Sequence, residues 1–474
     1  MSIDFHHPDY KDNYEKWELV EHMCESSDLE DYIVKLNPMD TSSENMTRNK
    51  QFLRRAVFYA IAGYTSRGLV GRMFSKWPKC ELPAELEYMK KNIDGSGNSI
   101  YQQSQDVAKS VVRGGRSFLM VDFTATGGQS SRADVLAGRV RANVLHYGAE
   151  DVINWDTRAI DGEILLSLIV LKSSRKVYKD KYSFESEDIR IEMFLDEAGE
   201  YAIQKWRKSE ELKGEWVVYE PPVYPLDSAG RKWKRIPGIF VGSESNTPTV
   251  DHPPMYDICL INKGHFNNSA LYEDSVFFNG QPQPWASGLS TDDAVAFREA
   301  GIYFGSGTLI PVPAGETLGI AQAAPNTLAR EAMRDKVDMS IGLGAMFIQP
   351  GSAVKTATQS EGEQKTAHSV LSLIASNISE AYAQVIEWAC VFMGAQFNPD
   401  LHLYEINRNY VDTSNNPQML QQIVAGFLQG VIPMSDYLSY MQKIEVVSDE
   451  TRLEDFADEV SAVRGVAAGG IQSV

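Results

Sequence analysis

The sequence predicts an α+β fold that is mainly helical, and three observations lead to this prediction. Helical patterns fill most of the first 115 residues and most of the chain after residue 253. Between them, residues 141–242 change to a period close to two, which is typical of strands. Two long helical patterns, 253–278 and 326–346, then bracket a segment rich in Gly and Pro. We therefore expect a β-rich module inside a helical frame.

The composition is that of a folded protein. Apolar residues make up 43% of the 474 residues and aromatic residues 10%, which is enough for real cores. The 45 Lys and Arg residues against 64 Asp and Glu residues give a net charge of −19. This balance argues against a conventional nucleic-acid-binding protein, which needs a basic surface. It is compatible with a protein that contacts DNA without binding it tightly.

Membrane and metal signals are missing from the sequence. No apolar run approaches the roughly 18 residues of a membrane span, and the N-terminus shows no signal peptide. Four cysteines lie far apart, at Cys24, Cys80, Cys259 and Cys390, so we expect neither a disulfide framework nor a zinc site, and a reducing cytoplasm. The eight histidines show no metal-ligand spacing, and His265 is expected to pack inside a helix.

The first half of the chain predicts four helices and then the β-rich module. The helices are expected at 11–27, 46–77, 83–92 and 99–113, and Gly114 and Gly115 end the last one. The pattern over 46–77 carries basic residues on one side and apolar residues on the other. "RSFLMVDF" (116–123) predicts a buried strand.

The second half predicts short mixed elements between long helices. "TDDAVAFREA" (291–300) predicts a short helix, with strands near "GIYF" and "TLIPV". A helix over 328–347, with a cap at Asn326 or Thr327, leads to the small and polar stretch "FIQPGSAVKTATQSEGEQK" (347–365). Smaller helices are expected near 417–429, 435–443 and 450–463.

Thr358 and Glu361 have capping-box spacing, which predicts a helix from Thr358 to Met393. Its apolar residues recur at heptad-like spacing, and the stripe includes Leu371, Ile378, Val385 and Phe392. Two interpretations stay open: packing inside one domain, or contact between subunits.

Signs of catalysis are absent from the sequence. It contains no GxxxxGK[ST], no HExxH and no GxSxG, and the lone G-x-G units in "DGSGNS" and "FGSGT" are typical of turns. We expect no enzyme, no catalytic residue, no metal and no cofactor.

Six stretches together resemble the portal protein of tailed double-stranded DNA bacteriophages, within a group long catalogued only as a domain of unknown function. They are "RRAVFYAIAGYTSRGLVGRMFSKWPKCELP", "GGRSFLMVDF", "VLHYGAEDVINW", "INKGHFNNSALYEDSVFFNGQPQPWASG", "KTATQSEGEQK" and "LQGVIPMSDYLSYMQK". The fifth departs from the family's "TATE" element, because Gln359 stands where an acidic residue is usual. Their order and spacing span most of residues 46–445.

The resemblance implies a portal fold with wing, stem, clip and crown regions. In this sequence, the implied regions are a wing over 1–252, a stem helix over 253–278, a clip over 279–325, a second stem helix over 326–346, a channel loop over 347–357, a long wing helix and strand over 358–411, and a crown with a C-terminal tail over 412–474.

The resemblance also implies a function and its residues. The chain would be a head-to-tail connector: a ring, usually a dodecamer in this family, at a capsid vertex of the virion, through which DNA is packaged and ejected. The channel loop would use Gln349, Pro350, Gly351, Ser352, Lys355 and Thr356. The clip and adaptor contact would use Trp285, Asp292, Asp293 and Arg298.

The implied partners are further copies of the chain, double-stranded DNA without sequence preference, the terminase, the major capsid and scaffolding proteins, and a head–tail adaptor, with no membrane. Assembly would take place in the host cytoplasm. One alternative is another oligomeric head–tail adaptor or capsid protein. The other is a soluble enzyme that uses Trp155, Trp206, Trp216 and Trp233 of the β-rich region as a substrate site.

Overall fold

The computed structural model describes most of the chain, and it has an α+β fold. The described residues are 3–123, 140–160, 162–209, 212, 214–280, 283–300, 315, 317–321, 327–346, 369–408, 410, 417–429, 431–443, 447 and 451–456. They divide into two compact units, Met1–Arg408 and Asn409–Val474, and each is described by itself.

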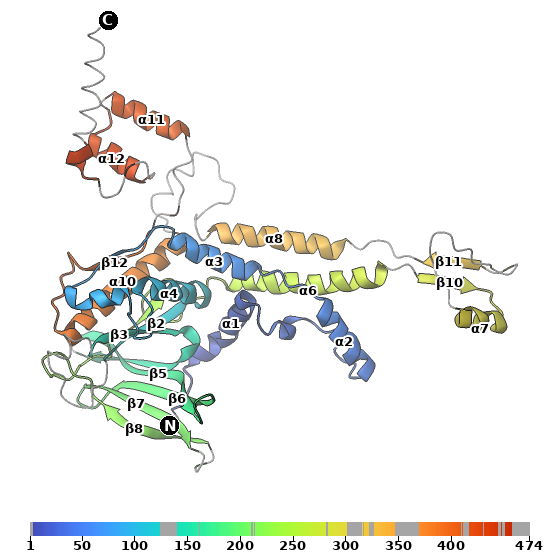
Figure 1. Cartoon of the computed structure of the whole chain (residues 1–474), viewed down its shortest axis with the longest axis horizontal. Coiled ribbons are helices and arrows are strands. Elements are labelled where there is room, and N and C mark those ends of the chain that lie inside the picture. Colours follow the sequence, from blue (N-terminus) through green and yellow to red (C-terminus); the bar gives the residue numbers. More distant parts are fainter. Residues whose placement is uncertain are drawn as a thin grey trace, which may run out of the picture. The chain divides into compact units, whose positions relative to one another are not determined.

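The first three helices of this unit all pack against a longer helix, α6, which is described below (Figure 1). These are α1 (Pro8–Glu25), α2 (Ser43–Arg55) and α3 (Ile61–Met73), followed by α4 (Ile100–Gly114) and the short η1 (Leu29–Tyr32), η2 (Ala84–Lys90) and η3 (Ala149–Asp151). A capping box at Ser99 and Gln102 starts α4, and Gly115 in the left-handed region ends it. The prediction for this helix is confirmed.

The predicted single helix over 46–77 is wrong, because the chain forms α2 and α3 with a break over 56–60. Ala56 ends α2 with φ −58° and ψ 132°, which is extended backbone. The residues of the break, "AVFYA", include a β-branched residue and two aromatic residues, and these lose side-chain freedom in a helix. Their backbone groups bind side chains of a later helix instead.

A three-stranded antiparallel sheet forms the centre of this unit, in the order β3 (Ala142–Gly148), β2 (Arg116–Phe123) and β9 (Gly238–Gly242). The first six side chains of β2 are buried, as the apolar run predicts. Both α4 and α10 (Val370–Met393) pack on this sheet. The small pair β1 (Lys79–Glu81) and β12 (Leu403–Glu405) lies beside α10.

Strands fill the range 141–242 as predicted, but they do not form one module: residues 152–223 form a five-stranded antiparallel meander (Figure 1), whereas β3 and β9 belong to the three-stranded sheet. The strands of the meander are β4 (Val152–Ile160), β5 (Glu163–Tyr178), β6 (Phe184–Leu195), β7 (Tyr201–Ser209) and β8 (Glu215–Val223). Side chains become more exposed towards the end of β5. Half-buried and exposed side chains first alternate there, and the last side chains are all exposed.

Two long helices, α6 (Tyr256–Asn279) and α8 (Leu328–Met346), lie side by side and run in opposite directions (Figure 1). Between them in sequence come β10 (Gln283–Ser287), α7 (Thr291–Ala300) and β11 (Thr317–Ala321). β10 and β11 pair antiparallel, with Trp285 opposite Gly319. The two long helices and α7 are confirmed. The strands predicted near 301–304 and 308–312 lie outside the described residues.

The helix predicted from Thr358 begins at Val370. Ser369 is its N-cap, and the Ser369 hydroxyl accepts a hydrogen bond from the backbone N–H of Ser372. Residues 358–368 lie outside the described part of the chain. Gly394, with φ 70°, ends the helix as predicted.

The second unit holds α11 (Pro417–Leu428) and α12 (Met434–Lys443), close to their predicted bounds. Phe427 of α11 stacks on Tyr437 of α12, with the ring centroids 4.0 Å apart. The predicted helix over 450–463 is described only as far as residue 456, and residues 453–456 are helical.

Candidate functional site: the paired long helices and their anchors

The long helix α6 holds the rest of the unit through three polar side chains that bind backbone. Asn262 accepts from the backbone N–H of Ala62 (2.9 Å) and donates to the carbonyl of Tyr59 (3.0 Å). The hydroxyl of Ser269 donates to the carbonyl of Val57 (2.7 Å) and accepts from its N–H (3.2 Å). Both side chains are buried, so they replace the hydrogen bonds that a continuous helix would have given this segment.

The third of these side chains is Asn267, which binds the stretch after η1 in the same two-way manner. It donates to the carbonyl of Tyr32 (2.9 Å) and accepts from the N–H of Val34 (2.9 Å). We call Asn262, Asn267 and Ser269 the backbone clamps. They fix the stretch after η1 and the α2–α3 connection on the first two-thirds of α6.

An ion-pair cluster holds α2 against the last third of α6. Asp274 accepts from Arg48 (Nη1, 2.9 Å) and from Arg55 (Nη2, 2.6 Å). The guanidinium of Arg55 also lies 4.4 Å from the ring centroid of Phe277, and that of Arg48 lies 4.6 Å from the centroid of Phe278. Burial alone would raise the pKa of Asp274, but the two arginines outweigh it and leave that pKa below its ordinary value.

The contact between α6 and α8 depends on a small residue. A Cβ added at Gly264 would lie 2.8 Å from Cε of Lys336 on α8, so the lysine stem lies across the glycine. His265, the next residue on α6, is buried, and its Nδ1 has no hydrogen-bond partner among the described residues. Burial and then the charge of Lys336 lower the pKa of His265, which favours the neutral packing histidine that the sequence predicted.

The predicted clip residues are placed only in part. Trp285 on β10 is half-exposed, and a Cβ at Gly319 of β11 would lie 2.7 Å from the indole ring, so the indole covers this glycine. Asp292 lies on α7 and is exposed. Asp293 and Arg298 also fall within α7, but their side chains lie outside the described part.

The predicted channel-loop residues, Gln349, Pro350, Gly351, Ser352, Lys355 and Thr356, lie outside the described residues. The apolar stripe is described, and Leu371, Ile378, Val385 and Phe392 are all buried within the unit. Phe392 stacks on Trp233 and Phe123, with centroids 4.2 Å and 5.3 Å away. Packing inside one domain therefore accounts for this stripe.

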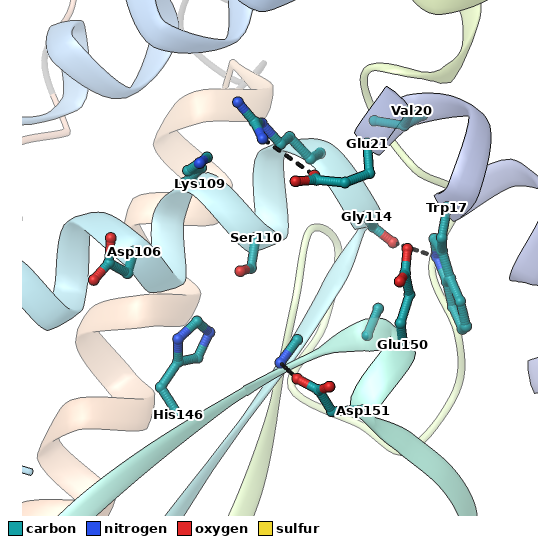
Figure 2. Close-up of a pocket in the computed structure, with 13 residues that line it drawn as sticks. Trp17, Val20, Glu21, Asp106, Lys109, Ser110, Gly114, His146, Glu150 and Asp151 are labelled. Carbon is teal, nitrogen blue, oxygen red and sulfur yellow. Dashed lines mark hydrogen bonds and ion pairs between the residues drawn. The ribbon is translucent and has the colours of Figure 1, made fainter. Parts of the chain in front are cut away.

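A pocket of about 400 Å³ lies between α1, α4 and the β3–η3 connection (Figure 2). Burial raises the pKa of Asp106, Glu150 and Asp151 at its wall, and burial lowers the pKa of His146 to about 4.

The cations of this pocket are already engaged. Arg113 pairs with Glu21 (3.1 Å) and Glu25, and Lys109 pairs with Glu25 (2.8 Å). Hydrogen bonds from Lys109 and Arg113 hold the pKa of Glu25 near 2.

The enzyme alternative gains little from this pocket. Ser110, His146 and Asp106 all line it (Figure 2), but Nε2 of His146 has no hydrogen-bond partner among the described residues, so the serine has no base in place. No group of three or more His, Cys, Asp or Glu in the described ranges could hold a metal ion.

The four tryptophans proposed for a substrate site do not form one. Trp155 is buried against Arg116, and Trp233 is buried against Phe392. Trp206 donates to Glu192 (2.8 Å), and Trp216 lies under Arg190, 4.5 Å from its guanidinium.

Sequence reasoning missed the residues that build this site, namely the backbone clamps and the Arg48–Asp274–Arg55 cluster. The available signal was the run "INKGHFNNSALYED", in which polar residues recur inside a helix without gathering on one face of it.

No helix in the described part of the chain has the length and apolar character needed to cross a membrane.

A family model described as a domain of unknown function (DUF4055) matches residues 254–393, from just before α6 to the end of α10. A comparison with curated proteins gives no match.

Similar solved structures come from gene transfer agent particles. One is a chain from the neck of an empty particle, with C6 symmetry, a TM-score of 0.39 and 13% identity over 79% of this chain and 87% of that chain. Another, from the neck of a native particle with C12 symmetry, has the same TM-score and identity over 82% and 92% of the two chains. A third comes from the native virion, again at 0.39 and 13%, over 80% and 88%. This is distant similarity, so a function has to be inferred from the chain's own elements.

Proposed function

We propose that this chain is a structural protein of the head–tail junction of a tailed, phage-like particle, and specifically a portal subunit. In this proposal the chain assembles into a closed ring of twelve copies, and double-stranded DNA passes through its axis. The ring sits in the virion at a capsid vertex and docks the terminase and a head–tail adaptor. No catalytic step belongs to this role.

One observation carries the proposal: α6 and α8 form an antiparallel pair that brackets the small β10–α7–β11 element (Figure 1). This is the order of stem, clip and stem that the sequence resemblance implies. The backbone clamps and the Asp274 cluster fix α6, one helix of this pair, to the α2–α3 region, so a force on α6 would reach the rest of the unit.

The alternative adaptor or capsid role would need no such pair of long helices. The enzyme role would need a site with an activated nucleophile, and the described pocket offers His146 without a partner. Neither alternative accounts for a half-exposed Trp285 on the antiparallel β10–β11 pair, at the far end of the two long helices.

Electron microscopy of the purified protein tests the proposal. We expect closed rings with an axial hole, and native mass spectrometry should give one dominant multiple of the 52.9 kDa chain. Monomers alone, at high protein load and with scaffolding protein added, would refute the ring.

The adaptor contact has its own test. Deleting 286–320 should leave the rest of the first unit folded and abolish tail attachment, and Trp285→Ala should weaken adaptor binding. Normal tail attachment by the deletion variant would remove the clip from the proposal.

The channel loop stays a proposal from the resemblance. Lys355→Ala should leave ring formation unchanged and alter DNA packaging or retention, because a lone lysine contacts phosphate without reading bases.

A further inference from the structure

Charge is strongly segregated over the first 80 residues. Residues 45–80, which include nearly all of α2 and all of α3, hold eight Lys and Arg residues and no acidic residue, in a chain whose net charge is −19. Residues 9–31, which include α1 and η1, hold nine acidic residues against two lysines. Segments 9–31 and 45–80 therefore carry opposite net charge.

Part of the basic charge is free to act outside the subunit. Arg48 and Arg55 are engaged by Asp274. In contrast, Lys50, Arg54 and Arg67 are exposed and have no ion pair with any described residue.

Lys50 and Arg54 lie one turn apart on α2, and Met46, one turn earlier, is 55% exposed. On α3, Arg67 lies over the ring of Tyr64, which is 69% exposed. We call Met46, Lys50 and Arg54, which lie one turn apart along α2, the basic surface.

The opposite charge is also free. Arg113 and Lys109 neutralise Glu21 and Glu25 within the subunit. Asp12 and Glu15 on α1, and Glu30 and Asp31 on η1, are exposed and have no ion pair within the described ranges. We call Asp12 and Glu15, which lie three residues apart on α1, the acidic surface.

We propose that the basic surface of one subunit docks on the acidic surface of the next copy of this chain. This inference rests on the proposed ring and names the contact that would close it. A ring with head-to-tail contacts needs two different and complementary surfaces on each subunit, and the chain carries such a pair.

Nucleic acid fits the observations less well than a second copy. DNA would use the basic surface and leave the acidic surface unexplained.

The contact should be sensitive to salt. Charges on exposed side chains are screened over about 8 Å at physiological ionic strength. Met46 adds apolar area whose burial salt does not weaken, so assembly should weaken with salt without vanishing.

Charge reversal in two variants tests the proposal. Lys50→Glu with Arg54→Glu makes both surfaces acidic, and Asp12→Lys with Glu15→Lys makes both basic. Each variant alone should need about tenfold or more protein for half-maximal assembly in native mass spectrometry, because like charges then face each other. An equimolar mixture should assemble again, with the two variants alternating, since every contact in the mixture pairs opposite charges.

The controls separate docking from folding and from charge in general. Lys181→Glu with Lys234→Glu makes the same change in net charge on exposed lysines of the sheet region, and it should assemble like the wild type. Far-UV circular dichroism and thermal midpoints of all variants should equal those of the wild type, because the changed side chains are exposed.

The outcomes also separate this inference from the proposed function. If the wild type forms rings and both variants assemble equally well, the docking surfaces are wrong and the ring stands. If the mixture fails to assemble, the complementarity is wrong. If Lys50→Glu with Arg54→Glu keeps its rings but loses retention on double-stranded DNA, the basic surface belongs to nucleic acid. If the wild type never forms rings, both proposals fail.

Discussion

Single residues decide how α6 holds its neighbours, and Asn262 is the clearest case. From a buried position, its side-chain amide donates to the carbonyl of Tyr59, inside the break between α2 and α3, and accepts from the N–H of Ala62, in the first turn of α3. Asn262→Ala leaves the N–H of Ala62 without a partner, and a buried unsatisfied group costs about 1–3 kcal/mol. We expect a lower free energy of unfolding by that amount, measured in urea.

A matched control for this change is Asn268→Ala, on the same helix and only half-buried. It should cost less than about 0.5 kcal/mol, as surface changes usually do. Equal losses from both variants would show that Asn262 is no special anchor.

The packing of α2 against α6 should depend on pH, because it uses the carboxylate of Asp274. Its pKa lies below the ordinary carboxylate value of about 3.9, so its contribution to stability is complete above that value. The contribution is lost as the pH falls through the lowered pKa. The thermal midpoint should therefore drop below about pH 4, and Asp274→Asn should remove this part of the drop while lowering stability at pH 7.

Hydrogen exchange provides the local measurement for this prediction. Amides of α2 should exchange faster in Asp274→Asn at pH 7, because Arg48 and Arg55 lose their shared partner. Unchanged exchange in α2 would mean that the cluster does not hold the helix.

At the scale of elements, the turn from α4 into β2 depends on Gly115. Its φ is 76°, and a Cβ there would lie 2.8 Å from the carbonyl oxygen of Asp251 and 3.0 Å from that of His252. Gly97 has φ 103° but nothing within 4 Å of a Cβ. Gly97→Ala should cost about 1–2 kcal/mol from backbone strain alone, and Gly115→Ala clearly more.

Urea unfolding of both glycine variants checks this comparison. The difference between them measures the clash with backbone, which cannot move as a flexible side chain can. A Gly115→Ala variant as stable as Gly97→Ala would contradict the tight packing at this turn.

Elements with local signals were predictable from the sequence, and those set by distant contacts were not. α4, β2 and α7 have a cap, an apolar run or flanking turns within a few residues, and the structure places them where the sequence predicts. The break over 56–60 depends on Asn262 and Ser269, some two hundred residues later, so no local pattern reveals it. The T-x-x-E pattern at Thr358 predicted too early a start for α10, because Ser369 provides the cap.

The candidate site divides in the same way. The paired helices and the apolar stripe were predictable from periodicity. The anchors were not, because polar residues such as Asn267 and Asp274 within a helix do not reveal which backbone or arginine they bind.

At the scale of the whole molecule, the two units have separate cores. The first is built around the three-stranded sheet and α10, whose buried apolar side chains pack against strands and helices of the same unit. In the second, Leu438, Met441 and Phe456 are the buried apolar side chains among its described residues after 410. A chain ending at Arg408 should therefore keep the fold of the first unit.

Truncation after Arg408 tests this separation. We expect a soluble protein whose thermal midpoint lies within a few degrees of that of the full chain, because 1 kcal/mol shifts the midpoint by about 2–4 °C in a domain of 150–250 residues and by less in a larger unit. Asn262→Ala should lower the midpoint equally in the truncated and the full chain, because its partners, Tyr59 and Ala62, both lie in the first unit. A truncated chain that aggregates, or in which Asn262→Ala has no effect, would show that the second unit contributes to the core of the first.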